Sequence, residues 1–160
     1  MYHLTEAYLM ATYICFLAMY LGALIFGTAV VAPIAVTTLD ERSAGFLLRR
    51  YWMAYHRFAV IGGLVFAVIA AVASTVSAIP VRYSWLLVSL ASLMTLSFYL
   101  AMTLIPRINQ AKDAADVASF SVLHRRNVTL VSLGMIVAML FIAASVYVLP
   151  GQFTFWPTAG

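Results

Sequence analysis

Four long apolar segments, separated by short polar connections, constrain this chain more than any other feature of its sequence. A membrane-spanning helix needs about 20 predominantly apolar residues, because each residue advances the helix by about 1.5 Å through a hydrocarbon core about 30 Å thick. The segments that reach this length are residues 7–39, 58–79, 85–105 and 128–149. The sequence therefore predicts an all-α, integral membrane four-helix bundle, with residues 1–160 forming a single transmembrane domain.

The overall composition supports a membrane environment. The chain is 65% hydrophobic and only 9% charged, whereas about a quarter of the residues of a soluble domain are charged. In water such a chain would expose large apolar patches. Cys15 is the single cysteine, which excludes an intramolecular disulfide and a paired-cysteine metal or redox motif.

The basic residues predict how the helices are oriented. The connections after the first and third spans hold eight of the nine Lys and Arg residues, namely Arg42, Arg49, Arg50, Arg57, Arg107, Lys112, Arg125 and Arg126. Because positive charge marks cytoplasmic loops, we expect both termini outside and these two connections in the cytoplasm of a bacterial inner membrane. The positive charge is thus interpreted as a topology signal and not as a nucleic-acid-binding surface.

Prolines and aromatic residues mark the expected borders of the spans. Pro80, Pro106 and Pro150 follow the second, third and fourth spans, and Pro33 lies near the end of the first. Proline lacks the N–H group that the helical ladder uses, so helix ends are expected there. The aromatic side chains expected at the outer interface are those of Tyr83, Trp85, Phe155 and Trp156.

Both basic connections show helical periodicity. In residues 44–55, apolar side chains recur at three- and four-residue intervals, and residues 108–122 show the same spacing. We expect amphipathic helices that extend the spans along the cytoplasmic interface. Ordinary solvated loops are the alternative interpretation.

Several small or unusual residues are predicted to have structural roles. Small side chains such as those of Gly22, Gly27 and Gly63 let helix backbones approach closely in lipid, where no hydrophobic force draws helices together. This pattern predicts a packed bundle and carries no information about chemistry.

Catalytic signatures are absent from the sequence. No Asp, Glu, Lys, Arg or His lies in the middle of a predicted span, and such residues are the usual markers of ion pathways and proton relays. No nucleophile–base pair, zinc motif or dinucleotide fingerprint is visible. The sequence favours a protein that is not an enzyme and predicts no catalytic residues, although chemistry with a borrowed cofactor remains open.

Two histidines form the one candidate cofactor site. His56 begins the second span and is followed by Arg57, and His124 precedes the fourth span and is followed by Arg125 and Arg126. Paired histidines can ligate haem iron, and arginines can bind its propionates. The favoured interpretation is that these residues belong to the polar interfacial belt, so no cofactor is predicted, with haem b or copper as the alternative.

Four short segments carry a resemblance to a known family. They are residues 21–33, 43–45, 104–109 and 120–124. Together they resemble a family of small four-helix membrane proteins that includes a transmembrane protein associated with cisplatin resistance and many bacterial members of unknown function. The likeness extends over residues 13–148 and implies a four-helix bundle with no assigned reaction. The positions that this family repeats would be Gly22, Pro33, Ala44, Gly45, Pro106, Asn109 and His124.

A more distant similarity of layout links the chain to copper-resistance D-type proteins and to haem-binding membrane protoporphyrinogen oxidases. The first span lacks the histidine expected of those haem enzymes. The leading functional hypothesis is therefore a non-enzymatic accessory subunit or scaffold, which contacts the lipid bilayer and packs against other membrane subunits or itself. The alternatives are a haem or copper protein that uses His56 and His124, and an export factor for a metal or drug.

Overall fold

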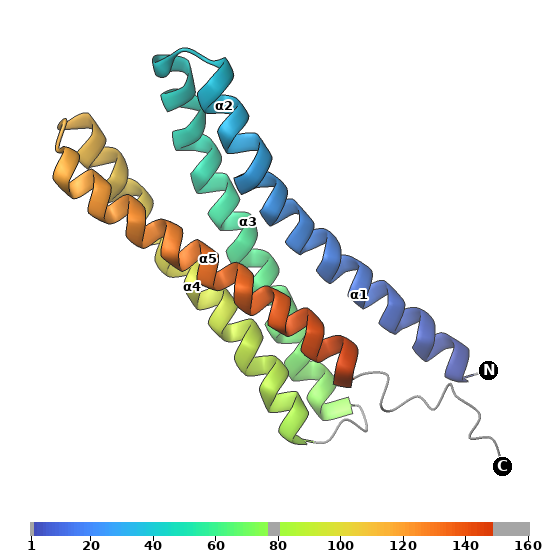
Figure 1. Cartoon of the computed structure of the whole chain (residues 1–160). Coiled ribbons are helices and arrows are strands. Elements are labelled where there is room, and N and C mark those ends of the chain that lie inside the picture. The colour runs from blue at the N-terminus through green and yellow to red at the C-terminus, as the bar shows by residue number, and fades with distance from the viewer. Residues whose placement is uncertain (1, 77–80, 149–160) are drawn as a thin grey trace.

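Long helices make up the fold. In the residues that this computed structural model describes, 2–76 and 81–148, the elements are α1 (Tyr2–Phe26), the π-helical turn η1 (Gly27–Val31), α2 (Ala32–Thr38), α3 (Glu41–Val76), α4 (Val81–Asp113) and α5 (Val117–Val148). Since η1 and α2 continue α1, the chain forms four rods that lie along one another (Figure 1). The stretches long and apolar enough to cross a membrane are Ala11–Thr38, Glu41–Ala73, Val81–Asp113 and Val117–Tyr147. The predicted four-helix membrane bundle is confirmed.

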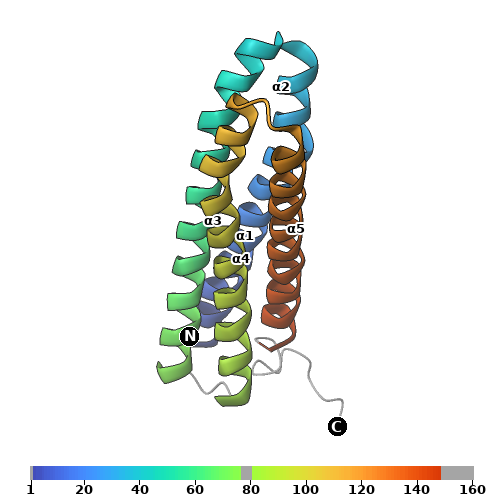
Figure 2. The ribbon, with the colours of Figure 1, turned by 90° about the vertical axis from the view of Figure 1, so that its left-hand side faces the viewer.

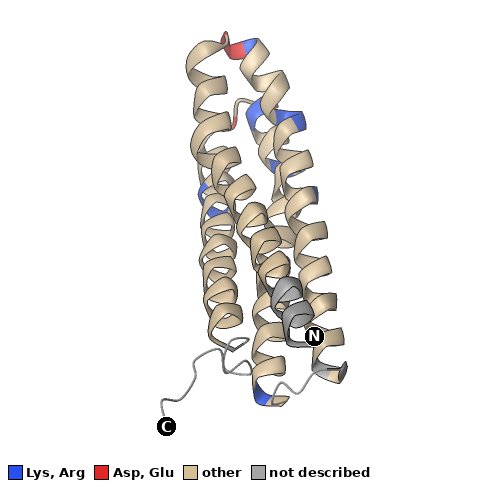
Figure 3. Cartoon of the chain, turned by 90° about the vertical axis from the view of Figure 1, so that its right-hand side faces the viewer, with Lys and Arg blue, Asp and Glu red and all other residues tan. Residues whose placement is uncertain are grey.

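The helices are longer than a bilayer core requires. α3 has 36 residues and α4 has 33, which correspond to rods of about 50 Å against a hydrocarbon core of about 30 Å. Figure 3 shows most Lys and Arg residues in the half of the bundle near α2. We call this half, which holds residues 39–40 and 114–116, the basic end.

The two amphipathic segments differ in how far they match the prediction. Residues 44–55 lie inside α3, as an unbroken extension of its span. Residues 108–122 are divided between α4 and α5 by a tight turn at residues 114–116, where Ala115 adopts a left-handed conformation with φ 54°. The helical spacing was therefore predicted correctly on both sides of the turn, but the second segment is not one continuous helix.

Aspartate side chains cap the N-terminal ends of α3 and α5. The Ser43 amide donates a hydrogen bond to Oδ1 of Asp40 at 3.0 Å, and the Ser119 amide donates to Oδ1 of Asp116 at 3.0 Å. A side-chain acceptor at this position satisfies an amide that has no partner within the helix. Hydrogen bonds from the side chain and amide of Ser119 hold the pKa of Asp116 below its ordinary value, and Ser43 lowers the pKa of Asp40 in the same way.

The prolines do not all end helices. Pro106 was expected to end the third span, but α4 continues through it to Asp113. Its exposed ring removes one hydrogen bond from the ladder, and the residues on either side remain helical. Pro33 lies in the first turn of α2, directly after η1, where the Ala32 amide donates to the Gly27 carbonyl. Pro80, Pro150, Phe155 and Trp156 lie outside the described residues.

Helix α1 packs on the bundle through one face. Leu17, Tyr20 and Leu24 are buried at three- and four-residue intervals, and the Tyr20 hydroxyl donates a hydrogen bond to the Ala59 carbonyl of α3 at 2.6 Å. The Tyr20 ring lies 5.4 Å from that of Phe66, centroid to centroid. Figure 2 shows α1 lying behind α4. This face therefore fixes the first span against α3.

Two glycines allow close helix contacts inside the bundle. A Cβ atom on Gly63 of α3 would lie 3.3 Å from the Cα atom of Thr95 in α4, and closer still to its hydroxyl. A Cβ on Gly27 would meet the hydroxyl of Tyr51 and the ring of Tyr55. Backbones and aromatic rings occupy the space that a larger side chain would need.

Candidate functional site

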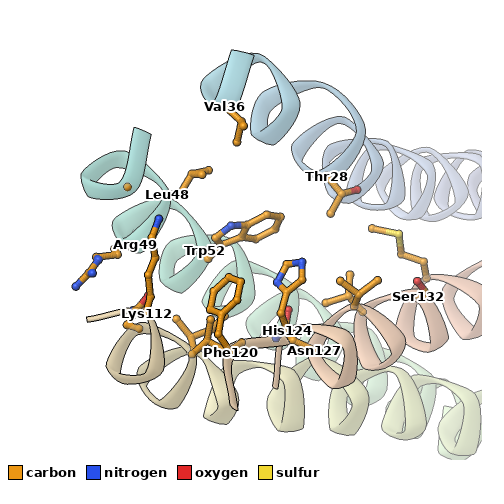
Figure 4. A pocket seen from close by; sticks show the side chains of 17 residues that line it. Thr28, Val36, Leu48, Arg49, Trp52, Lys112, Phe120, His124, Asn127 and Ser132 are labelled. Carbon is orange, nitrogen blue, oxygen red and sulfur yellow. The ribbon is translucent and has the colours of Figure 1, made fainter. Parts of the chain in front are cut away.

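A cavity of about 560 Å³ lies at the basic end, between α3, α4 and α5, and η1 and α2 each contribute one residue to its lining. Its volume falls within the range of about 300–1,000 Å³ that is typical of small-molecule sites. The described residues that line it are Thr28, Val36, Gly45, Leu48, Arg49, Trp52, Ile105, Ile108, Asn109, Lys112, Phe120, His124, Asn127, Val128, Val131, Ser132 and Met135. Figure 4 shows these side chains converging on the cavity from η1, α2, α3, α4 and α5.

Aromatic rings form part of the wall. The rings of Phe120 and His124, one turn apart on α5, are stacked with their centroids 5.6 Å apart and an interplanar angle of 6°. The spacing of four residues places both side chains on the same face of the helix. Trp52 of α3 projects toward them from the other side (Figure 4).

Asn127 fixes this part of α5 to α4. Its side-chain amide donates a hydrogen bond to the Ala101 carbonyl at 2.8 Å, and the Asn127 side chain is buried. Side-chain amides that bond across helices hold membrane bundles together. One polar residue therefore both lines the cavity and positions its wall.

An ion pair joins α3 and α4 beside the cavity. Nη1 of Arg49 donates to Oδ2 of Asp113 at 2.8 Å, and Nη2 donates to Oδ1 of the same carboxylate. This two-point geometry is the favoured one for a guanidinium and a carboxylate. Arg49 lines the cavity, whereas Asp113 lies outside the lining, so the pair closes the bundle at the edge of the site.

His56 lies in a different environment from His124. Its side chain is fully buried, and Nδ1 lies 2.7 Å from the Trp52 carbonyl, so that nitrogen carries the proton and donates. The rings of Trp52 and Tyr55 lie 6.1 Å and 5.3 Å from the imidazole. Nε2 is buried without a hydrogen-bond partner among the described residues. His124 is exposed, and only His124 lines the cavity.

The arginines predicted as propionate partners, Arg57, Arg125 and Arg126, do not line the cavity. Arg125 and Arg126 border a separate, shallow groove between α4 and α5, together with Thr103 and Thr129. Arg57 is exposed on α3 and is absent from the cavity lining. In the described residues no group of three or more His, Cys, Asp or Glu side chains could hold a metal ion.

The residues predicted to be structural have several environments. Gly45 lies at the mouth of the cavity, where its missing Cβ would be 3.8 Å from Nζ of Lys112, and Asn109 lines the cavity. Gly22 is exposed on α1, with nothing within 4 Å of where a Cβ would lie. Pro33 is exposed as well.

Sequence reasoning missed Trp52, Lys112, Phe120 and Asn127 as members of one site. Periodicity placed Trp52 on an apolar stripe, and the charge pattern placed Lys112 in a loop. A weak signal was available, because a lone asparagine at the start of an apolar span usually bonds to a neighbouring helix. The grouping of the other three residues depends on how α4 and α5 cross α3, and no local sequence pattern encodes that crossing.

Comparison with known proteins bears on this region. Neither curated proteins nor solved structures gave a match. Residues 15–116 match the family model described as a domain of unknown function, DUF4149. The match includes α3 and α4, which supply one side of the cavity, and ends directly before α5. Since the matched residues make up more than half of the chain, this membrane protein belongs to the DUF4149 family.

Proposed function

We propose that this protein is a non-enzymatic accessory protein that holds a small amphiphilic molecule in the cavity at the basic end. The observation that carries the proposal is the character of the lining, in which apolar and aromatic side chains surround a few polar groups. Ligand sites typically have this composition. The hydroxyl of Thr28, which lines the cavity, donates to main-chain carbonyls of α1 and not to a base.

The orientation of the bundle would place this cavity at the cytoplasmic leaflet. Two of the basic residues that predict the cytoplasmic side, Arg49 and Lys112, line the cavity. We therefore propose that the ligand enters from the inner leaflet of a bacterial inner membrane. Export of a metal or a drug remains an alternative use of the same cavity.

Native mass spectrometry of gently solubilised protein tests this function. The wild-type protein should carry a bound small molecule. Ser132→Phe places a ring in the cavity and should reduce the ligand-bound fraction at least tenfold. Leu133→Phe is the matched control, because Leu133 is the next residue of α5, is 41% exposed and does not line the cavity. Equal ligand occupancy in the two variants would contradict the proposal.

A second candidate function, the scaffold, is supported by the outer face of α1. Ala11, Cys15, Ala18 and Gly22 are exposed at three- and four-residue intervals, on the side opposite Leu17, Tyr20 and Leu24. Large exposed side chains, including Phe16 and Met19, border this strip. A strip of small residues between large ones is typical of a face that packs against another helix in lipid. We propose that it receives a transmembrane helix of another membrane subunit.

The Gly22→Leu variant tests the scaffold role. It should release the partner from complexes extracted in mild detergent without destabilising the chain, because no atom lies within 4 Å of the added Cβ. If the wild-type protein is a homodimer and the Gly22→Leu variant is a monomer, the partner is a second copy of this chain. A complex that is unchanged in size and composition would exclude this face.

The haem or copper alternative has one supporting observation. The bond from Nδ1 of His56 to the Trp52 carbonyl leaves Nε2 as the bare ring nitrogen, and metal-ligating histidines commonly show this arrangement. The cavity does not bring His56 and His124 together, however. A haem bound by both would give an intense Soret band that His56→Ala and His124→Ala each abolish. A spectrum without that band, together with metal analysis that finds no copper, would remove the alternative.

A further inference from the structure

The cavity has a charged end and an apolar end. Lys112 and Arg49 lie near the ends of α4 and α3, at the mouth. Farther along α5 toward the middle of the bundle, the lining changes to Val128, Val131 and Met135. A ligand that matches this lining has one polar head and one hydrocarbon tail.

The charge at the mouth is positive and partly unneutralised. Arg49 is held by Asp113 at two points. The ammonium group of Lys112 makes no hydrogen bond or ion pair with a side chain that the structure describes, although its charge attracts the neighbouring carboxylate of Asp113. It lies beside Gly45. None of the described lining residues is Asp or Glu. The head group that complements this end is therefore an anion, which an ammonium binds through charge-assisted hydrogen bonds.

The shape of the cavity suits one chain. Along α5 the lining extends from Phe120 to Met135, which corresponds to a length of about 22 Å at about 1.5 Å per residue. The cavity is also open at the side, since Val36 and Val128, which line it, are 62% and 48% exposed. In a bilayer these residues face lipid, so a hydrocarbon tail can enter laterally without passing through water.

We infer that the cavity binds a single-chain amphiphile with an anionic head, a carboxylate or a phosphate monoester, whose head lies at Lys112 and whose tail runs along α5 toward Met135. This inference rests on the proposed function, because it identifies the ligand of the same cavity. It adds the sign of the head-group charge, the number of tails and the residue that recognises the head.

Quenching of Trp52 fluorescence by brominated ligands measures this binding directly, because Trp52 lines the cavity. A Trp85→Phe/Trp156→Phe background leaves Trp52 as the single tryptophan. The probes are dibromostearate, the dibrominated stearyl alcohol of equal length, and a lysophosphatidate with a dibrominated chain. The carboxylate should bind about tenfold more tightly than the alcohol, as expected for one charge-assisted hydrogen bond.

Lys112→Met should remove this preference, because it keeps an apolar side chain and deletes the charge. Arg107→Met is the matched control, since Arg107 is an exposed cation of the same helix that does not line the cavity, and it should keep the tenfold preference. Comparison of dibromostearate with the lysophosphatidate distinguishes a fatty acid from a phosphate head group.

Failure of this inference is distinguishable from failure of the proposed function. If the alcohol binds as tightly as the carboxylate, or if Lys112→Met retains the preference, the anionic ligand class is wrong while the cavity remains a ligand site. If no probe quenches Trp52 and Ser132→Phe also leaves the ligand-bound fraction in native mass spectrometry unchanged, both proposals are wrong.

Discussion

The side-chain amide of Asn127 on α5 donates a hydrogen bond to the main-chain carbonyl of Ala101 on α4 at 2.8 Å, inside the bundle. Asn127→Ala should therefore lower the free energy of unfolding by about 0.6 kcal/mol, the average measured for such bonds between membrane helices, and by no more than about 1.7 kcal/mol, the largest value measured. Unfolding in mixed detergent micelles gives the change. Thr129→Ala serves as the control, because Thr129 bonds only to the Arg125 carbonyl of its own helix. Equal losses in the two variants would show that the bond to α4 contributes nothing.

Two glycines should respond in opposite ways to the same substitution. Gly63→Leu should destabilise the bundle by about 1–3 kcal/mol, a typical cost of overpacking, because its side chain would collide with Thr95. Gly22→Leu should leave stability unchanged, because the space around it is open. Thermal unfolding in detergent distinguishes the two. A destabilised Gly22→Leu variant would mean that α1 packs through its other face.

The hydroxyl of Tyr20 should contribute to the attachment of α1. Its hydrogen bond to the Ala59 carbonyl is short, at 2.6 Å, whereas the Tyr55 hydroxyl lies 3.3 Å from the Leu24 carbonyl. Tyr20→Phe should thus cost about 1 kcal/mol and Tyr55→Phe less. Unfolding in detergent and the protease sensitivity of α1 show which of the two substitutions destabilises the protein more. The reverse order would contradict this assignment.

Acidification should loosen the start of α5. The hydrogen bonds from Ser119 lower the pKa of Asp116 from its ordinary value of 3.8. The carboxyl group of Asp116 is more acidic in the folded chain than in the unfolded chain. Its contribution to stability is therefore fully present above the ordinary pKa and disappears as the pH falls through the pKa of the folded state. Hydrogen exchange of the Ser119 amide should accelerate in that pH range, when its rate is compared with the rate of an unstructured amide at the same pH. Asp116→Asn, which caps without titrating, should show no such change.

The orientation of the bundle can be tested by cysteine labelling in a Cys15→Ser background. Because eight of nine basic residues lie at one end, Ser43→Cys should be accessible only from the cytoplasm, and Thr5→Cys and Thr158→Cys only from outside. Labelling of positions 5 and 158 from opposite sides would contradict an even number of spans.

The sequence alone determined the number of membrane helices and the clustering of charge at one end. Both properties are local, since a span of about 20 apolar residues has only one low-energy conformation in lipid, where every backbone polar group must be bonded within the helix. The extension of α3 through residues 44–55 was predictable for the same reason, because its periodicity is a property of one segment.

Only the tertiary structure decided which residues share a site. The pairing of His56 with His124 was a hypothesis from equal depth, but depth does not specify the direction in which a side chain points. His56 turns into the core and bonds to the Trp52 carbonyl, while His124 stacks on Phe120 in the cavity. The partnership of Arg49 with Asp113, 64 residues apart, likewise depends on how α3 crosses α4. Crossing geometry arises from the fit of many side chains between helices, and for that reason a single sequence read segment by segment does not reveal it.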